Sequence, residues 1–220
     1  MEKKTERKPF ILLSEGAEFE LVEKKSRFLA ESICVQSEEE VLSALERIRK
    51  QHYNARHHCY AYCYGEQYEN TRISDDGEPT GTAGKPIFDM IRGIPATGCL
   101  VVVTRYFGGI LLGTGGLVRA YGGAAKGVLA ASGFQKLLPA KRYSLRTDYA
   151  DWGKLQYYLS AQGLTPYDQE FTDRVFCRVN VALDSCGAFI KGVTELFAGR
   201  LIPAEEGEDS IREPYRPDSG

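Results

Sequence analysis

The pattern of apolar and polar positions predicts a hairpin and then a helix near the start of the chain. Residues 19–23 and 27–35 are strand-like and are separated by the polar turn 24–26, as expected for two paired strands. Ser37 and Glu40 have the spacing of a capping box, which predicts a helix beginning at Ser37. Apolar residues then recur at helical spacing: Val41, Leu45 and Ile48.

The next elements carry most of the unusual residues of the sequence. Residues 58–64 predict a strand in which two sets of side chains alternate: Cys59, Ala61 and Cys63 on one face, Tyr60, Tyr62 and Tyr64 on the other. A polar loop, residues 74–84, leads into a short helix near Pro86. Residues 99–107 predict a buried strand, 108–116 a glycine loop and 117–131 a helix.

After Gly133 the pattern changes to that of a second, smaller domain. The order of predicted elements is β-α-β-β-α-β, which is the ferredoxin-like pattern. These elements are residues 143–149, 151–162, 165–171, 174–183, 185–198 and 200–203. The predicted organisation is a loosely held lead-in (1–17), an N-terminal domain (18–137), a C-terminal domain (140–204) and a disordered acidic tail (205–220).

Composition places the chain among globular proteins. It has 220 residues, of which 43% are hydrophobic and 26% charged, and its formal net charge is −2. No window is apolar enough for a membrane span, and the first residues lack the apolar segment of a secretory signal. The six cysteines have no framework spacing, so reduced thiols and a cytoplasmic location are expected.

Charge is unevenly distributed along the chain. Residues 90–147 contain no Asp or Glu, whereas residues 205–218 are rich in them. The acid-free stretch holds Arg92, Arg105, Arg119, Lys126, Lys136, Lys141, Arg142 and Arg146. Such asymmetry is typical of nucleic-acid or phosphate binding, although an apolar, glycine-rich core would also exclude acids.

The predicted strand, glycine loop and helix between residues 99 and 131 form a candidate anion site. Unpaired N–H groups and the dipole of a helix N-terminus favour negative charge there. The spacing is neither that of a P-loop nor that of the dinucleotide fingerprint. Arg119, Gly123 and Lys126 share one helix face, which would let a phosphate backbone approach closely; tight packing would explain the glycine equally well.

Two other clusters have competing interpretations. The loop at residues 74–86 either holds magnesium through its acids and a phosphate through Lys85, or is a turn whose Asp and Ser side chains accept from its own N–H groups. Cys59 and Cys63 are about 13 Å apart on a strand, which is too far for one zinc ion. His57 and His58 are candidates for a surface contact, for proton transfer or for a structural role.

The motifs resemble those of the YigZ/IMPACT family. The matching stretches are His57-His58-Cys59-Tyr60-Ala61, Ser74-Asp75-Asp76-Gly77-Glu78-Pro79, Gly81-Thr82-Ala83-Gly84-Lys85-Pro86, Val102-Val103-Thr104-Arg105-Tyr106-Phe107-Gly108-Gly109 and Leu112-Gly113-Thr114-Gly115-Gly116-Leu117-Val118-Arg119-Ala120-Tyr121. Motif positions without an assigned role are His57, His58, Ser74, Asp75, Asp76, Gly77, Glu78, Pro79, Gly81, Thr82, Gly84, Tyr106, Gly108, Gly109 and Tyr121. The later β-α-β-β-α-β segment resembles the small C-terminal domain of bacterial members.

The resemblance implies a two-domain α+β protein. The first domain would be similar to the fourth domain of elongation factor G, with its left-handed βαβ crossover, and the second to the ferredoxin-like fifth domain of that factor. Eukaryotic relatives are translational regulators that compete for an activator of a starvation-sensing kinase. That mechanism is not carried over to this chain, because fold does not fix function.

The leading hypothesis is a non-enzymatic cytosolic protein of translation or the stress response that binds structured RNA or a ribosomal or translation-factor surface. Predicted phosphate contacts are Lys85, Arg105, Gly113, Gly115, Gly116, Arg119, Gly123 and Lys126. Tyr60, Tyr62 or Tyr64 is a candidate for base stacking, although burial of this tyrosine face in the core is the favoured alternative. Two alternatives are a magnesium-dependent small-molecule phosphotransferase, with Asp75, Asp76 and Glu78 as metal ligands, and a protein–protein adaptor. No cofactor and no membrane partner are predicted, and the oligomeric state stays open.

Overall fold

The computed structural model describes residues 8–217 and divides into two compact units. The N-terminal unit comprises residues 10–136, joined by residues 214–217. The C-terminal unit comprises residues 137–213. Within the described residues, no helix has the length and apolar character needed to cross a membrane.

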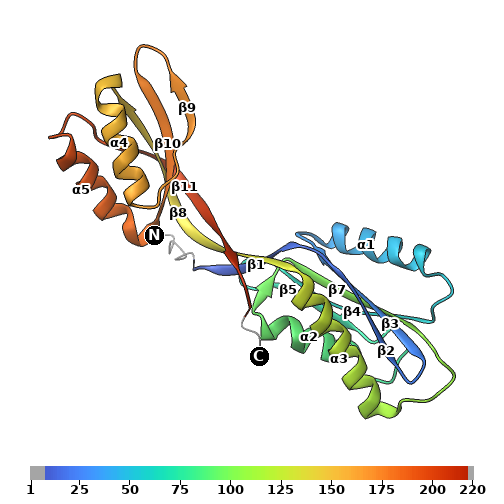
Figure 1. Ribbon diagram of the computed structural model, residues 1–220. Helices are drawn as coiled ribbons and strands as arrows, with labels where there is room; N and C mark the ends of the chain where they lie inside the picture. Colours follow the sequence, from blue (N-terminus) through green and yellow to red (C-terminus); the bar gives the residue numbers. More distant parts are fainter. Residues whose placement is uncertain (1–7, 218–220) are drawn as a thin grey trace, which may run out of the picture. The chain divides into compact units, whose positions relative to one another are not determined.

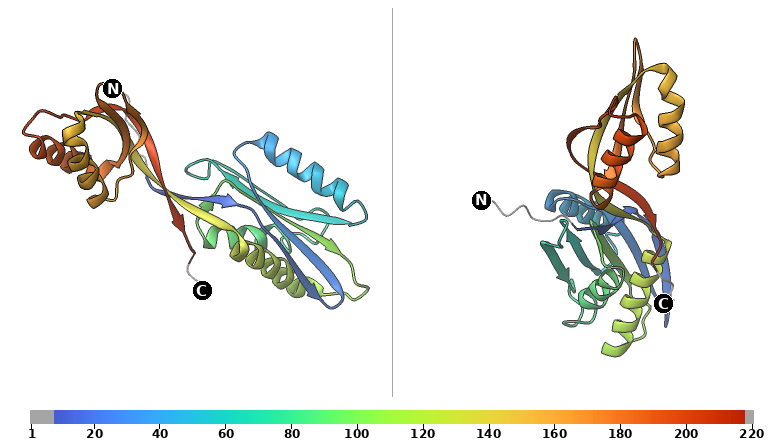
Figure 2. Two further views of the ribbon diagram at one scale, coloured as in Figure 1. Left: turned by 45° about the horizontal axis from the view of Figure 1, so that its top comes forward. Right: turned by 90° about the vertical axis from the view of Figure 1, so that its left-hand side faces the viewer.

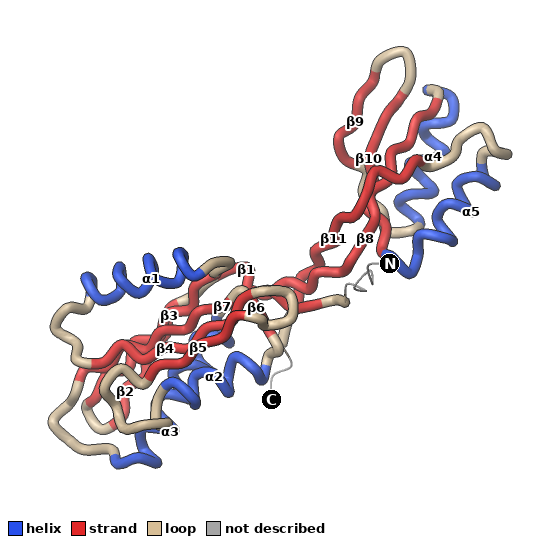
Figure 3. Tube along the Cα trace, turned by 180° about the vertical axis from the view of Figure 1, so that it is seen from behind, coloured by secondary structure: helices blue, strands red, loops and turns tan. Residues whose placement is uncertain are grey.

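The N-terminal unit is built on a five-stranded sheet. The strand order is β2 (Glu18–Glu23), β3 (Ser26–Cys34), β7 (Cys99–Tyr106), β4 (His57–Tyr64) and β5 (Asn70–Ser74), with every neighbouring pair antiparallel. Helix α1 (Glu38–Gln51) lies on one face of this sheet, whereas α2 (Gly84–Gly93) and α3 (Gly113–Ala131) lie on the other (Figures 1 and 3). Both faces of the central strands are therefore buried.

The alternation predicted for residues 58–64 is confirmed in β4. Cys59, Ala61 and Cys63 belong to the core beneath α2 and α3, whereas Tyr60 and Tyr62 belong to the core beneath α1. Stacking of the Tyr60 and Tyr62 rings, with centroids 6.3 Å apart, fills the space next to the helix.

The predicted start of α1 is also confirmed. The Ser37 hydroxyl accepts a hydrogen bond from the N–H of Glu40 at 3.2 Å. The Glu40 carboxylate accepts from the N–H of Gln36, one residue before the cap, rather than from Ser37 as in a full capping box.

The predicted loosely held lead-in is wrong for residues 10–15. These residues form β1 (Phe10–Glu15), which pairs in parallel with the short strand β6 (Ala96–Thr97). Leu13 is fully buried in the main core, so its apolar side chain fixes the segment. Residues 1–7 of the predicted lead-in lie outside the described residues.

The C-terminal unit has the predicted β-α-β-β-α-β order. Its elements are β8 (Gly133–Thr147), α4 (Tyr149–Ala161), β9 (Tyr167–Phe171), β10 (Val175–Ala182), the short 3₁₀ turn η1 (Leu183–Ser185), α5 (Cys186–Leu196) and β11 (Ala204–Tyr215). The strand order is β11-β8-β10-β9, so each helix connects two strands that are separated by a third. Both helices lie on the same face of this sheet (Figures 1 and 2). The fold class is therefore α+β, as predicted, with a ferredoxin-like second unit.

The predicted final strand at residues 200–203 and the predicted disordered tail are both wrong. The last strand is β11, which pairs with β8. Its acidic side chains form ion pairs with basic residues of β8 and β10: Glu205 with Lys141 at 2.7 Å, Asp209 with Arg142 at 2.6 Å and Glu206 with Arg178 at 2.7 Å. Part of the acid-free stretch is thus neutralised by the acidic end of the chain. Residues 218–220 lie outside the described residues.

Candidate nucleic-acid interface

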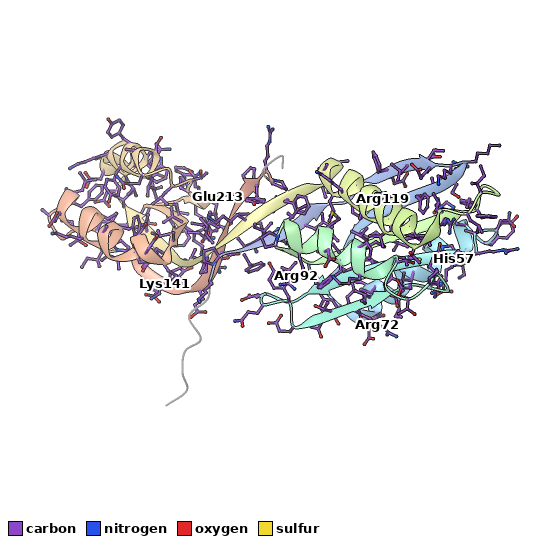
Figure 4. The ribbon with its side chains drawn as sticks, turned by 90° about the horizontal axis from the view of Figure 1, so that it is seen from below. His57, Arg72, Arg92, Arg119, Lys141 and Glu213 are labelled. Atoms are coloured by element: carbon purple, nitrogen blue, oxygen red, sulfur yellow. The ribbon has the colours of Figure 1, made fainter. Side chains whose placement is uncertain are left out.

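The register of the five-stranded sheet brings the sequence motifs to one end of the N-terminal unit. Arg27 pairs with Tyr106, and His57 pairs with Arg105. The start of β3, the end of β7 and the start of β4 therefore lie side by side, with β5 ending next to them. We call this region the motif end; it consists of Lys24, Lys25, His57, the loops at residues 75–83 and 107–112, and the first turn of α3 (Figure 4 labels His57).

Asp75 closes the loop that precedes α2. Its carboxylate accepts hydrogen bonds from the N–H groups of Gly81 at 2.8 Å, Ala83 at 3.0 Å and Gly84 at 2.9 Å. Burial alone would raise the pKa of Asp75, but the three N–H donors together hold this pKa below its usual value. Asp75 therefore caps α2 from outside the helix, because the N-cap residue Ala83 has no polar side chain.

Two hydroxyl groups of the same loop also form hydrogen bonds with its backbone. The Ser74 hydroxyl accepts from the N–H of Asp76 at 3.3 Å, and the Thr82 hydroxyl donates to the carbonyl oxygen of Pro79 at 2.7 Å. Gly77 has a positive φ of +86°, which favours glycine. The turn interpretation of residues 74–86 is the one that these contacts support. Lys85 lies beyond the turn and forms an exposed ion pair with Asp89 at 2.7 Å.

Glu78, Arg105 and Tyr121 form a buried cluster beneath the motif end. One Glu78 oxygen accepts from Arg105 Nη1 and from the Tyr121 hydroxyl, each at 2.7 Å. Arg105 is 6% exposed and Glu78 is 9% exposed. Burial raises the pKa of Tyr121 well above its usual value, so the phenol stays a donor. The predicted contact of Arg105 with RNA phosphates is corrected accordingly: its guanidinium is buried, and its Nη1 is paired with Glu78.

The two histidines tie β4 to the same loop. The backbone N–H of His58 donates to the Asp76 carboxylate at 2.7 Å, and His57 Nδ1 donates to the carbonyl oxygen of Asp76 at 2.9 Å. Burial lowers the pKa of His58, although the nearby charge of Asp76 opposes this effect. Of the roles considered for His57 and His58, a structural role is the one that explains these two hydrogen bonds.

The cysteines of β4 have separate partners. Cys59 Sγ donates to the carbonyl oxygen of Asp75 at 3.0 Å, and burial raises the pKa of this thiol to about 12. Cys63 Sγ donates to the carbonyl oxygen of Ala96 at 3.2 Å. Among residues 8–217, no group of three or more His, Cys, Asp or Glu residues is arranged to hold a metal ion.

The surface of the motif end combines exposed cations with exposed apolar side chains. Lys24 and Lys25 occupy the β2–β3 turn with positive φ values of +46° and +65°. In the loop after β7, Phe107 is 53% exposed and Leu111 82% exposed. The two segments touch through their backbones, because a Cβ at Gly108 would overlap the backbone of Lys25.

Helix α3 begins at the motif end without a cap. It starts at Gly113, earlier than the predicted residue 117. Its N-cap residue, Leu112, makes no side-chain cap hydrogen bond, and its first turn contains no acidic residue. Arg119 Nη1 instead lies 3.7 Å from the position that a Cβ on Gly115 would occupy. A cation therefore lies next to the positive end of the helix dipole, where an anion is favoured.

Packing explains part of the glycine content of α3. A Cβ at Gly127 would overlap the ring of Phe19 in β2, and a Cβ at Gly123 would be 3.7 Å from Leu21. Gly123 is exposed and Gly116 is buried. Lys126 is exposed on the same helix.

Sequence reasoning missed Lys24, Lys25 and the apolar residues of the loop after β7. Two signals pointed to them. A hairpin turn favours Asn-Gly at the positions that the two lysines occupy, and Phe107, Ile110 and Leu111 are apolar residues within a loop.

Relief of backbone strain at the hairpin is expected to stabilise the N-terminal unit. Left-handed backbone costs about 1–2 kcal/mol for an L residue with a side chain, but little for glycine, and less for asparagine than for most residues. The double variant Lys24→Asn, Lys25→Gly should therefore raise the free energy of unfolding by about 1–2 kcal/mol, and Tm by roughly 2–4 °C per kcal/mol. Calorimetry of wild type and variant measures the change in Tm. A lower Tm in the variant would show that the backbone of the two lysines is not strained.

The Impact N-terminal domain model matches residues 24–129, and a domain of unknown function (DUF1949) matches residues 145–200. The chain is 35% identical to IMPACT family member YvyE of Bacillus subtilis over 90% of the chain and 91% of that protein. It is 42% identical to IMPACT family member YigZ of Escherichia coli over 57% of the chain and 63% of that protein.

A solved structure described as the crystal structure of a hypothetical protein is 31% identical, with a TM-score of 0.58, and covers 89% of this chain and 96% of its own. Fold and domain order define a two-domain α+β protein in which an Impact N-terminal domain precedes a DUF1949 domain. The chain belongs to the IMPACT family. The expected likeness to two domains of elongation factor G stays a prediction.

Proposed function

We propose that the motif end binds structured RNA, and that the protein is a cytosolic, non-enzymatic factor of translation or the stress response. The observation that carries this proposal is the uncapped start of α3 with Arg119 beside it. Helix dipole and guanidinium repel each other unless an anion lies between them. A phosphate group of RNA would satisfy both the free N–H groups and the arginine.

The charges around α3 support the same conclusion. Lys24 and Lys25 are exposed on the neighbouring turn. Asp75 and Glu78 point inward and are occupied by hydrogen-bond donors, so they do not oppose a polyanion at the surface. The contacts proposed for RNA are therefore Lys24, Lys25 and Arg119, together with the N–H groups of residues 113–115.

The contacts at the motif end bear differently on the two alternative hypotheses, a phosphotransferase and a protein–protein adaptor. The phosphotransferase hypothesis needs the acids of residues 75–78 as magnesium ligands, and these carboxylates already bind N–H groups, Arg105 and Tyr121. The adaptor hypothesis keeps one supporting observation, because Ile110 and Leu111 are exposed and apolar. Binding measurements with protein-free RNA separate it from the proposal.

Replacement of Arg119 by glutamine is expected to weaken binding to an RNA stem-loop. Loss of one phosphate contact should also make the slope of log K against log salt shallower, by about 0.7–0.9. The matched control is Arg92→Gln, which removes an arginine from the last turn of α2 in the same unit (Figure 4).

A fluorescence-anisotropy titration of the stem-loop at several salt concentrations makes this comparison. Arg92→Gln should bind like wild type. Equal losses in both variants would contradict a localised interface, and the absence of RNA binding by wild type would favour the adaptor hypothesis.

A further inference from the structure

We propose that Phe107 is a base-stacking residue, which receives an unpaired nucleobase of the bound RNA on its exposed ring. This inference rests on the proposed function, since it names the part of the RNA that the motif end recognises. It also gives a role to the buried cluster of Glu78, Arg105 and Tyr121: these are positioning residues for the Phe107 ring.

The first argument is the support beneath the ring. Arg105 Cζ lies 5.5 Å from the ring centroid of Phe107 and 5.5 Å from that of Phe28. Phe28 in turn contacts Tyr121 edge-on, with centroids 5.1 Å apart. The buried guanidinium of Arg105 therefore contacts the Phe107 ring and a second aromatic ring of the core, that of Phe28.

The second argument is that this support is rigid. Arg105 is held by Glu78 at 2.7 Å, and the same Glu78 oxygen is held by Tyr121. An aromatic ring that is already fixed loses little conformational entropy when a base stacks on it. The half-exposed ring of Phe107 is thus in contact with a buried, hydrogen-bonded arginine.

The third argument is the space and charge around the ring. Phe107 is followed by Gly108 and Gly109, which have no side chains to cover it. Lys25 contacts Gly108 through the backbone, so the exposed Lys24-Lys25 turn adjoins the loop that carries Phe107. Aromatic residues beside cations are the arrangement that binds unpaired nucleotides, with stacking for the base and cations for the phosphates.

Burial excludes two of the three tyrosines that the sequence suggested for stacking. Tyr60 is 8% exposed and Tyr62 is 7% exposed, and both lie in the core beneath α1. The predicted contact of Tyr60 or Tyr62 with bases is therefore wrong. Tyr64 is half-buried, stacks on Tyr62 and lies at the end of β4 opposite to His57. Phe107 is the aromatic residue that the loop after β7 leaves open at the motif end.

The test compares two RNA probes of equal phosphate number: a stem-loop with an unpaired purine loop and a fully paired duplex. Phe107→Ala should weaken stem-loop binding by roughly 5- to 150-fold, the range for one stacked base, and leave duplex binding unchanged. Phe107→Tyr should restore stem-loop binding, because it keeps the ring. Leu111→Ala is the matched control for loss of a neighbouring exposed apolar side chain.

A fluorescent probe makes the stacking visible. Trp152 is the single tryptophan of the chain and lies in α4 of the C-terminal unit. In the double variant Trp152→Phe, Phe107→Trp, the tryptophan reports only on the motif end. Its emission should be quenched by the stem-loop and unaffected by the duplex.

The outcomes separate this inference from the proposed function. Equal binding of the stem-loop by wild type and Phe107→Ala, or quenching by neither RNA, would overturn base stacking. The proposed function would still hold if Arg119→Gln weakened binding in that case. Failure of wild type to bind either RNA would overturn both.

Discussion

Replacement of Glu78 by alanine is expected to lower the free energy of unfolding by about 3–5 kcal/mol. The carboxylate is the partner of the buried Arg105 guanidinium and of the Tyr121 hydroxyl. Its removal leaves a buried charge and a buried hydroxyl without an acceptor, which is far more costly than loss of an exposed pair. Because Arg105 supports Phe107, the motif end should lose its order as well.

Urea unfolding followed by far-ultraviolet circular dichroism measures this loss. Asp89→Ala is the matched control, since it breaks the exposed Lys85–Asp89 pair and should cost less than about 1 kcal/mol. A loss of stability at Glu78 as small as that at Asp89 would show that the cluster does not hold the motif end.

Replacement of Asp75 by asparagine is expected to cost about 2–4 kcal/mol at neutral pH. The carboxylate accepts from three backbone N–H groups, and an amide offers one acceptor oxygen and adds its own donors. The loss should appear as fraying of the start of α2 and of the loop before it.

The effect at Asp75 should depend on pH in a defined direction. The folded-state pKa of Asp75 is lowered by its N–H donors, against the opposing effect of burial. Its stabilisation is therefore complete above the unfolded-state pKa of about 3.9 and is lost as pH falls through the lower folded-state value. Wild type and Asp75→Asn should converge in stability in strong acid, where the carboxyl is protonated. If the difference in stability between wild type and Asp75→Asn stayed constant down to strongly acidic pH, the ionised carboxylate of Asp75 would not be what caps α2.

Local patterns predicted much of the fold. The alternation of Cys59 and Ala61 with Tyr60 and Tyr62 identified β4 and assigned its two faces, because burial on a strand has a period of two. The N-cap of α1 was readable for a similar reason, since Ser37 contacts the N–H of a residue only three positions away. Both features depend only on residues a few positions apart, so a short stretch of sequence is enough to predict them.

The predictions that were wrong concern segments whose structure depends on residues far away in the sequence. An acidic run such as residues 205–209 is typical of a solvated tail, and only the distant Lys141 and Arg142 turn it into a paired strand. The early start of α3 escaped prediction because Gly113, Gly115 and Gly116 have poor helix propensity.

The sequence motifs of the candidate site were identified, but which of their side chains are buried and which are exposed was not predicted. Arg105 was expected at the surface because arginine is usually exposed, and its burial depends on Glu78 in a distant loop. Phe107 was missed for the converse reason: the apolar residue stays exposed where the loop leaves the sheet.

The measurement that tests the central claim most directly is the RNA affinity of the double variant Lys24→Asn, Lys25→Gly. This variant should be more stable than wild type, so weaker binding cannot be attributed to a damaged fold. It should bind an RNA stem-loop more weakly, with a slope of log K against log salt that is shallower by about 1.4–1.8 for two lost phosphate contacts. An unchanged affinity and an unchanged salt slope would contradict RNA binding at the motif end.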